Sequence, residues 1–232
     1  RKKKAMDLFD VIGPVMVGPS SSHTAGAARI GKITRRLLGC RPVRARIGLY
    51  GSFQKTYLGH GTDKALVGGL LGMNVDDLRL RNSLEIARQE GLEYSFYPAE
   101  LRHAHPNTVV LEVEGEDGRQ LAVQASSVGG GEIRVNAIDG LEAGFSGHEN
   151  TIVLTYADTR GMIAAISKQV SEAHLNIATM RVFRDTQGGK AIMALELDGE
   201  APEELLRALS HLRDVYRVAY LPAAEESTSC EP

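Results

Sequence analysis

Cysteine is scarce in this 232-residue chain, which contains only Cys40 and Cys230. The two cysteines form no CxxC pair, and neither has a histidine close by at the spacing of a metal site. A disulfide framework is therefore not expected. An iron–sulfur cluster is normally held by several cysteine thiolates, so this chain is not expected to hold one by itself.

The chain also lacks an excess of charge of either sign. Lys and Arg total 27 and Asp and Glu total 29, which gives a formal net charge of −2. This balance does not favour nucleic acid as a partner. The one basic run, Arg1 to Lys4, is followed by no basic helix and no interleaved aromatics. A solvated terminus explains that run more simply than an anionic partner does.

Long apolar runs are missing as well. The longest such stretches fall far short of the roughly 20 residues that span a bilayer, so no membrane segment is expected. No apolar signal core with a small-residue cleavage site follows the basic start, and a cytoplasmic location is the expectation. The nucleotide-binding patterns GxxxxGK[ST] and GxGxxG are both absent.

Hydrophobic periodicity predicts a mixed α+β fold for the first part of the chain. The spacing of Ala27, Ile30, Ile33 and Leu37 predicts a helix that ends at Gly39. Ser22 or Thr24 is the expected N-cap of that helix. The other elements expected in this part are a strand over 43–49, a polar loop from Gly51, a helix from Thr62 or Asp63 to Leu71, a helix over 84–89, a strand over 94–97, a β-hairpin over 108–127 and a strand over 133–137.

A second unit is predicted after residues 140–147, a stretch with three glycines and no strong pattern, where we place the domain boundary. Strands are expected over 151–156, 177–183, 191–197 and 215–221, with one helix after the first strand and another before the last. The order βαββαβ is the ferredoxin-like arrangement. The predicted division is therefore 1–147, 148–222 and a flexible tail, 223–232.

The most unusual stretch is GPSSSHTAG at residues 18–26. A rigid Gly-Pro pair precedes hydroxyl and imidazole side chains that lead directly into a helix. Free backbone N–H groups and the positive end of the helix dipole suit a carboxylate or phosphate there. His23 adds a group that can move protons near neutral pH. Because Ser and Thr are common helix caps, a plain capped helix start is the alternative interpretation.

Three further stretches place polar groups beside flexible backbone. They are GSFQKT with the following GHGTD over 51–63, HPNT over 105–108 and SVGGG over 127–131. Glycines on both sides of His60 would let the backbone approach a ligand closely. Each stretch taken alone is explained equally well by an ordinary loop with a helix cap.

Taken in order, these segments resemble the bacterial iron–sulfur-dependent L-serine dehydratases. The similarity covers FDVIGPVMVGPSSSHTAG over 9–26, GHGTD over 59–63, HPNT and SVGGG, and it extends from about Phe9 to Leu221. In one branch of that family a single chain holds every part, and in another branch separate α and β subunits divide the work. Because the cysteine-bearing half is missing, this chain resembles the β subunit.

The resemblance implies a lyase reaction, L-serine to pyruvate and ammonia, carried out with a cysteine-rich α subunit. That partner would hold a [4Fe–4S] cluster, one iron of which would bind the serine hydroxyl as a Lewis acid. It also implies an allosteric-substrate-binding-type first domain and no metal ligand in this chain. The residues implied are His23, Ser22 and Thr24 for catalysis, and Ser20, Ser21, Ser22, His60, Thr62, Asp63 and Asn107 for substrate binding.

The second unit resembles an ACT domain, a small module that commonly binds amino acids between two copies. Asp158, Arg160 and Gly161 match the usual ligand-facing loop, and Asn176 matches the ligand-facing turn. Self-association through this domain is the expectation. Some ACT domains only dimerise, so a purely structural role is the alternative.

Two other functions are compatible with the sequence. One is a stand-alone regulatory protein that senses an amino acid through the ACT domain and has no catalytic partner. The other is an anion-binding structural subunit in which His23 is only a helix-start residue. Co-purification of a brown, cysteine-rich partner would favour the dehydratase over both.

Overall fold

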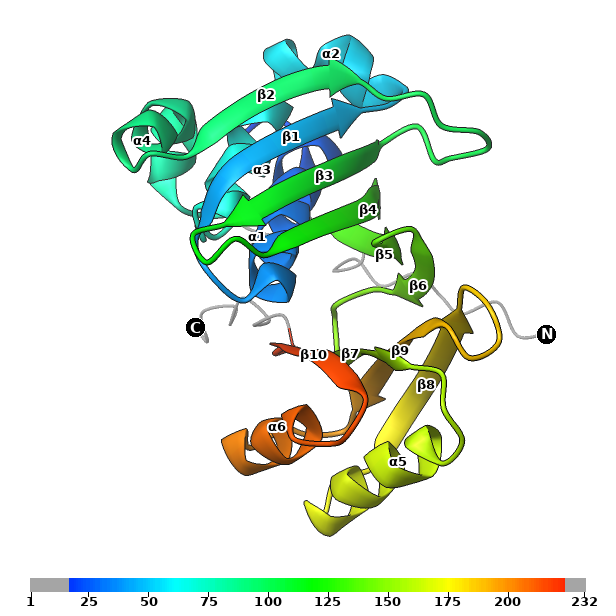
Figure 1. Ribbon diagram of the computed structural model, residues 1–232. Helices are drawn as coiled ribbons and strands as arrows, with labels where there is room; N and C mark the ends of the chain where they lie inside the picture. The colour runs from blue at the N-terminus through cyan, green and yellow to red at the C-terminus, as the bar shows by residue number, and fades with distance from the viewer. Residues whose placement is uncertain (1–16, 224–232) are drawn as a thin grey trace, which may run out of the picture.

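The computed structural model describes residues 17–223, which form two β-sheets of six and four strands (Figure 1). The predictions for Arg1 to Lys4, for residues 9–16 of the opening motif and for Cys230 lie outside the described residues. The α+β fold class predicted from the sequence is confirmed. Among residues 17–223, no helix is both long enough and apolar enough to cross a membrane.

The first sheet has the strand order β2-β1-β3-β4-β5-β6. Strand β1 pairs parallel with β2, and every other neighbouring pair is antiparallel. Alternation along β1 buries Ala45 and Ile47 in the core and leaves Arg44 and Arg46 exposed on the other face. The strands are β1 (Pro42–Leu49), β2 (Glu93–Pro98), β3 (Thr108–Gly115), β4 (Gln120–Gly129), β5 (Glu132–Ile138) and β6 (Leu141–Phe145).

Helices cover one face of this sheet (Figure 1). They are α1 (Ala27–Leu38), α2 (Ser52–His60), α3 (Thr62–Leu70) and α4 (Ser83–Gln89). A π-helical turn, Ser21–Gly26, leads directly into α1. Helices α1 and α3 pack unusually closely, because a Cβ on Gly31 would overlap the carbonyl oxygen of Leu66 and one on Gly69 would overlap that of Ala28. Only glycine at both positions permits this contact.

The second sheet has the order β10-β7-β9-β8, with α5 and α6 on one face. The chain order β7-α5-β8-β9-α6-β10 is the predicted βαββαβ arrangement, and the unit is ACT-like in topology. Its elements are β7 (Asn150–Ala157), α5 (Met162–Glu172), β8 (Ile177–Arg184), β9 (Lys190–Leu197), α6 (Glu203–Ser210) and β10 (Val215–Leu221).

The other face of the second sheet packs against the first part of the chain. Strand β10 contacts α1, and β8 and β9 contact β6. Val153, Ile192 and Ala219 belong to the same hydrophobic cluster as Ile33 of α1. The predicted boundary at 147/148 falls between β6 and β7. Because one cluster of side chains spans both sides of it, a division into independent domains stays a prediction.

The predicted helix caps are wrong. The N-cap of the first helical turn is Ser20 rather than Ser22 or Thr24, and its Oγ accepts a hydrogen bond from the His23 N–H at 3.2 Å. The helical conformation therefore begins before the first residue of the apolar pattern, because the π-helical turn consists mostly of polar residues. The N-cap of α3 is Gly61, with φ of 69°, and not Thr62 or Asp63, which already lie inside that helix.

One α-helix and one strand were missed because their apolar signal is weak. Residues 52–60, predicted as a polar loop, form α2, in which only Phe53 is buried. Residues 140–147, predicted as a boundary without structure, contain the short edge strand β6. A helix with one buried residue and a five-residue strand interrupted by glycine have too few apolar positions to reveal a period.

Candidate functional site

The π-helical turn places the His23 imidazole between two hydroxyl groups. Ser20 Oγ, from the same turn, lies 3.4 Å from His23 Nδ1. Ser52 Oγ, at the start of α2, lies 3.1 Å from His23 Nε2. Both ring nitrogens therefore have a polar neighbour, which fixes the orientation of the ring. π-helical turns are rare and occur often at functional sites.

The side chain of His60, from the end of α2, lies against the same imidazole. The ring centroids of His23 and His60 are 4.9 Å apart, and Phe53 contacts His23 edge-on at 5.4 Å. Burial lowers the pKa of His23 below its usual value, and the like charge of His60 lowers it further. His23 is therefore held in the neutral form at neutral pH, and a neutral imidazole can accept a proton.

Thr24 connects the two histidine-bearing segments. Its Oγ1 donates a hydrogen bond to the His60 carbonyl oxygen at 3.1 Å, across 36 positions of sequence. The Thr24 side chain is buried, and its only hydroxyl proton is used in this hydrogen bond. Ser21 and Ser22 differ from Thr24, since they are partly exposed and their hydroxyls form no hydrogen bond among residues 17–223. Thr24 thus joins its turn to the end of α2, whereas Ser21 and Ser22 have hydroxyls without a partner in the part of the chain that the structure describes.

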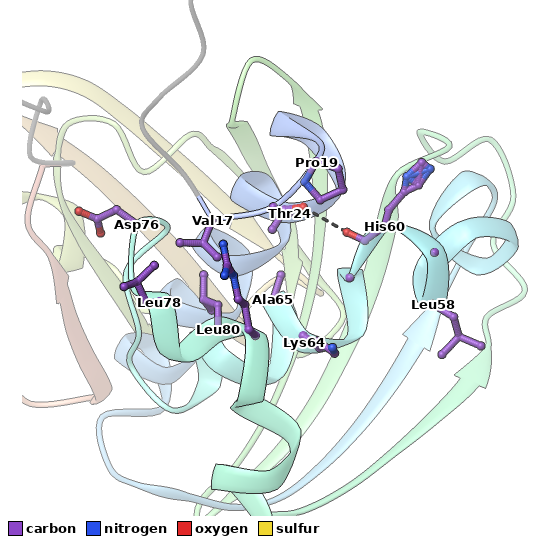
Figure 2. Close-up of a pocket in the computed structure, with 14 residues that line it drawn as sticks. Val17, Pro19, Thr24, Leu58, His60, Lys64, Ala65, Asp76, Leu78 and Leu80 are labelled. Carbon is purple, nitrogen blue, oxygen red and sulfur yellow. Dashed lines mark hydrogen bonds between the residues drawn. The ribbon is translucent and has the colours of Figure 1, made fainter.

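A cavity of about 780 Å³ lies beside this histidine cluster, between the Gly18-Pro19 segment, the end of α2 and the start of α3. Figure 2 shows the Thr24–His60 hydrogen bond at its edge, with the His60 ring directed away from Lys64 and Ala65. Lys64, Arg81 and Asp76 bring charges of both signs to its lining. Leu58 and Leu78, also in the lining, are 72% and 69% exposed.

Thr62 and Asp63 lie buried at the start of α3, next to His60 in the sequence. Thr62 Oγ1 and Asp63 Oδ1 have no hydrogen-bond partner within the described chain. Burial raises the pKa of the Asp63 carboxyl. Buried oxygens without a donor are costly in free energy, so both favour a ligand that brings hydrogen-bond donors. Neither residue is hydrogen-bonded to His23 in residues 17–223.

The HPNT and SVGGG motifs join the cluster through the backbone. The Ser52 N–H donates to the Pro106 carbonyl at 2.7 Å, and the Ser127 N–H donates to the Asn107 carbonyl at 3.0 Å. Gly26 packs directly on Ser127, because a Cβ at position 26 would overlap the Ser127 side chain. Asn107 Oδ1 and Ser127 Oγ are buried and have no partner in the described residues. Segments spread over residues 18–131 therefore meet at one place.

Ser52 lies in the GSFQKT stretch noted in the sequence, but it was not predicted as a site residue. It lies 29 positions from His23, and no local pattern links the two. The available signal was Gly51, whose φ of 61° lets the chain turn into α2 directly after β1. A glycine followed by serine at the end of a predicted strand is consistent with such a turn, but the region was predicted as a loop.

In the ACT-like unit, two of the predicted ligand residues already have partners within the chain. Asp158 Oδ2 accepts hydrogen bonds from Arg184 Nη1 at 2.8 Å and from the Gly188 N–H at 3.1 Å. The Arg184 bond, and then the Gly188 bond, hold the pKa of Asp158 below its usual range. Asn176 Nδ2 donates to Asp198 Oδ2 at 2.6 Å.

The four predicted positions of this unit do not meet within one copy. Asp158, Arg160 and Gly161 precede α5, and Asn176 follows it. An α-helix of 11 residues is about 16 Å long. Arg160 and Gly161 are exposed, and Gly161 has a φ of 89°. A small ligand could therefore contact residues from both ends of α5 only where two copies of the unit meet.

The described residues do not fit an iron–sulfur cluster. Among residues 17–223, no three Cys, His, Asp or Glu side chains lie close enough together to hold a metal ion. Cys40 follows the end of α1 opposite to the His23 turn, and its Sγ lies 3.2 Å from Asp117 Oδ1. Burial, followed by this contact with Asp117, raises the pKa of the Cys40 thiol, which disfavours the thiolate that a metal requires.

The fold and the site define a two-sheet α+β protein with a partly buried histidine cluster in its first part and an ACT-like second unit. A family model described as serine dehydratase beta chain matches residues 5–94. The chain is 39% identical to the probable L-serine dehydratase beta chain of Bacillus subtilis (strain 168), over 93% of this chain and 97% of that protein. It belongs to the serine dehydratase beta chain family.

Other relatives extend this comparison. The L-serine dehydratase beta chain of Peptoniphilus asaccharolyticus is 38% identical, over 87% of this chain and 91% of that protein. A D-3-phosphoglycerate dehydrogenase of Bacillus subtilis is 27% identical over 67% of this chain and 30% of that protein. The ACT domain of a Chlorobium tepidum GTP pyrophosphokinase matches at 20% identity with a TM-score of 0.27, over 35% of this chain and 94% of that domain. The ACT-like description rests on the strand order.

Proposed function

We propose that this chain is the β subunit of an L-serine dehydratase that converts L-serine to pyruvate and ammonia together with a separate α subunit. The observation that supports this most strongly is the His23 cluster, in which the hydroxyls of Ser20 and Ser52 and the ring of His60 surround an imidazole with a lowered pKa. Relatives of nearly the same length as this chain are named beta chains, which supports a second subunit. The cysteine-rich α subunit is proposed to hold the [4Fe–4S] cluster.

The proposed part of this chain is to bind the substrate and to move one proton. The free hydroxyls of Ser21 and Ser22, at a helix start, suit the carboxylate of serine. His23 accepts the Cα proton at Nε2, the nitrogen that faces Ser52, while Nδ1 faces Ser20. Burial and, to a smaller extent, the like charge of His60 favour the neutral imidazole, and the His60 ring packs against it.

The remaining predicted residues fit the substrate's ammonium group. An ammonium ion is a donor only, and it is stabilised by buried oxygens that have no donor of their own. Thr62, Asp63 and Asn107 each present such an oxygen among the described residues. We propose these three as ammonium-binding groups, with Thr24 holding the backbone of His60 for them.

The test of this function is reconstitution. The chain alone, purified without oxygen, is expected to be colourless and to release no pyruvate from serine, because its described residues hold no cluster. Addition of the α subunit with a rebuilt cluster should restore pyruvate formation, measured by a coupled reductase assay. Steady turnover by this chain alone in the absence of iron would contradict the proposal.

Ser52 gives a second test of the site. Ser52→Ala removes the hydroxyl next to His23 Nε2 and is expected to lower kcat roughly 3- to 10-fold, the effect of one neutral hydrogen bond. Ser52→Thr keeps the hydroxyl and should retain most of the activity. The control is Thr56→Val on the same helix, which loses only a bond to the Ser52 carbonyl. Equal losses in Ser52→Ala and Thr56→Val would assign the effect to α2 and not to His23.

For the ACT-like unit we propose binding of a small amino acid between two copies, through the exposed loop at Arg160 and Gly161. Asp158 and Asn176 are proposed to shape this loop and turn, since each already has a hydrogen bond within the chain. Self-association through the second unit is part of the same proposal. The helices cover one face of its sheet and the first part of the chain covers the other, so a second copy would meet an edge.

A further inference from the structure

Two arginines from different sheets converge on Gly144, where the two sheets meet. Gly144 lies on β6, the edge strand of the first sheet, and β6 contacts β8, the edge strand of the second (Figure 1). An atom at the Cβ position of Gly144 would lie 3.7 Å from Arg134 Nη2 and 3.8 Å from Arg181 Nη1. The two guanidinium groups therefore flank one point in space, and residue 144 has no side chain to fill it.

Neither arginine is neutralised by residues 17–223. Arg134 and Arg181 take part in no ion pair and no hydrogen bond of the described chain, and Arg181 Nε is buried without an acceptor. Arg217, at the same junction, differs, since it donates to the Gln120 carbonyl at 3.1 Å and lies 3.8 Å from Asp139 Oδ2. A buried guanidinium N–H without an acceptor is costly, and a second guanidinium close by adds repulsion.

The acidic side chains near Gly144 do not neutralise the positive charges of Arg134 and Arg181. Glu196 of β9 stands opposite Thr179 of β8, on the same face of the sheet as Arg181, and it forms no ion pair in the described residues. Glu142 precedes Gly144 on β6 and is exposed. The two positive groups thus converge while the nearby carboxylates pair with neither of them.

We propose that Arg134 and Arg181 bind a small oxyanion, a carboxylate or a phosphate, over Gly144. The planar fork of a guanidinium matches two oxygens of such an ion, and two forks on one ion satisfy donors that the protein leaves unpaired. Gly144 keeps the point free, and its φ of 71° disfavours any other residue there.

This site is separate from the His23 cluster. Arg134 stands opposite Ser126 on β4, whereas the neighbouring Ser127 packs on Gly26 of the π-helical turn. Successive residues of a strand point to opposite faces of the sheet, so the two sites lie on different faces. Because one arginine comes from each sheet, a bound anion would bridge the two units and stabilise their junction.

The experiment uses the full chain with inorganic phosphate and with acetate as separate probes, against sodium chloride at equal ionic strength. Binding is measured by calorimetry, and thermal unfolding is followed in parallel. At least one probe is expected to bind and to raise the melting temperature above that in chloride. Arg134→Gln and Arg181→Gln should each weaken that binding about tenfold or more. Binding of phosphate alone identifies a phosphate site, and binding of acetate identifies a carboxylate site.

The matched control is Arg213→Gln, which removes one positive charge from a side chain that is 96% exposed on the second unit. Its affinity should equal that of the unaltered chain. Arg134 is itself exposed, so Arg134→Gln is expected to fold even if Arg181→Gln does not. The proposal is overturned if neither probe binds at tens of millimolar, or if Arg134→Gln and Arg213→Gln bind equally well.

Discussion

Replacing His23 with alanine is expected to lower serine turnover by the complex with the α subunit about 10²- to 10⁴-fold, the usual effect of losing a positioned acid or base. The ring is held by hydroxyls at 3.4 and 3.1 Å on its two nitrogens. Burial and His60 keep it neutral. Initial rates of pyruvate formation per folded β subunit give the measurement.

A purely structural role for His23 predicts a different pattern. In that case His23→Ala would lower the melting temperature and leave the rate per folded molecule nearly unchanged. Since the imidazole lies on a turn and is only partly buried, we expect the opposite, a small change in melting temperature and normal binding to the α subunit. His211→Ala, an exposed histidine at the end of α6, is the control and should change neither quantity.

The pH profile tests the same role independently. His23 accepts a proton only when neutral, so kcat/KM should fall as the pH drops through its pKa, which lies below the usual value of 6.5. His60→Gln removes the repulsion of a neighbouring charge and should raise the pKa of His23, which moves this acidic limb to higher pH. Burial is the larger cause of the lowered pKa and is retained in His60→Gln. The acidic limb of this variant should therefore still lie at a lower pH than that of an exposed histidine. An unchanged limb in His60→Gln would contradict the proposed coupling.

Replacing Gly31 or Gly69 with alanine is expected to lower the stability of the fold, the second large effect. At each position an added Cβ would overlap a backbone carbonyl of the facing helix, so α1 and α3 must move apart. Overpacking of this kind costs about 1–3 kcal/mol, and contact with backbone places both variants at the upper end. For a chain of this length the melting temperature should fall by roughly 5–10 °C. Thermal and urea unfolding give the measurement.

Gly59→Ala is the matched control for both variants. Gly59 also lies inside a helix, but no atom comes within 4 Å of its Cβ position. Alanine is favoured over glycine in a helix, so this variant should be neutral or slightly more stable. If Gly31→Ala and Gly59→Ala unfold at the same temperature, the close contact between α1 and α3 is not what stabilises this part of the fold.

The sequence by itself determined the fold class and most of the strands. Alternation along residues 43–49 predicted a half-buried strand, and strand β1 has that burial. The βαββαβ order of the second unit followed from apolar periods alone, because each of its elements buries enough residues to show one. The opening motif directed attention to His23, and the count of two cysteines led to the expectation that a partner chain holds the cluster.

Only the tertiary structure decided which of these groups meet. Ser52 and His23 are 29 residues apart, and Thr24 and His60 are 36 apart, so no local pattern could pair them. Helix α2 was missed because one buried residue shows no period, and yet it carries Ser52 and His60 to the imidazole. Propensity and periodicity depend on near neighbours in the chain. Contacts between side chains depend on how whole helices and strands pack, and here that packing requires the two glycines between α1 and α3.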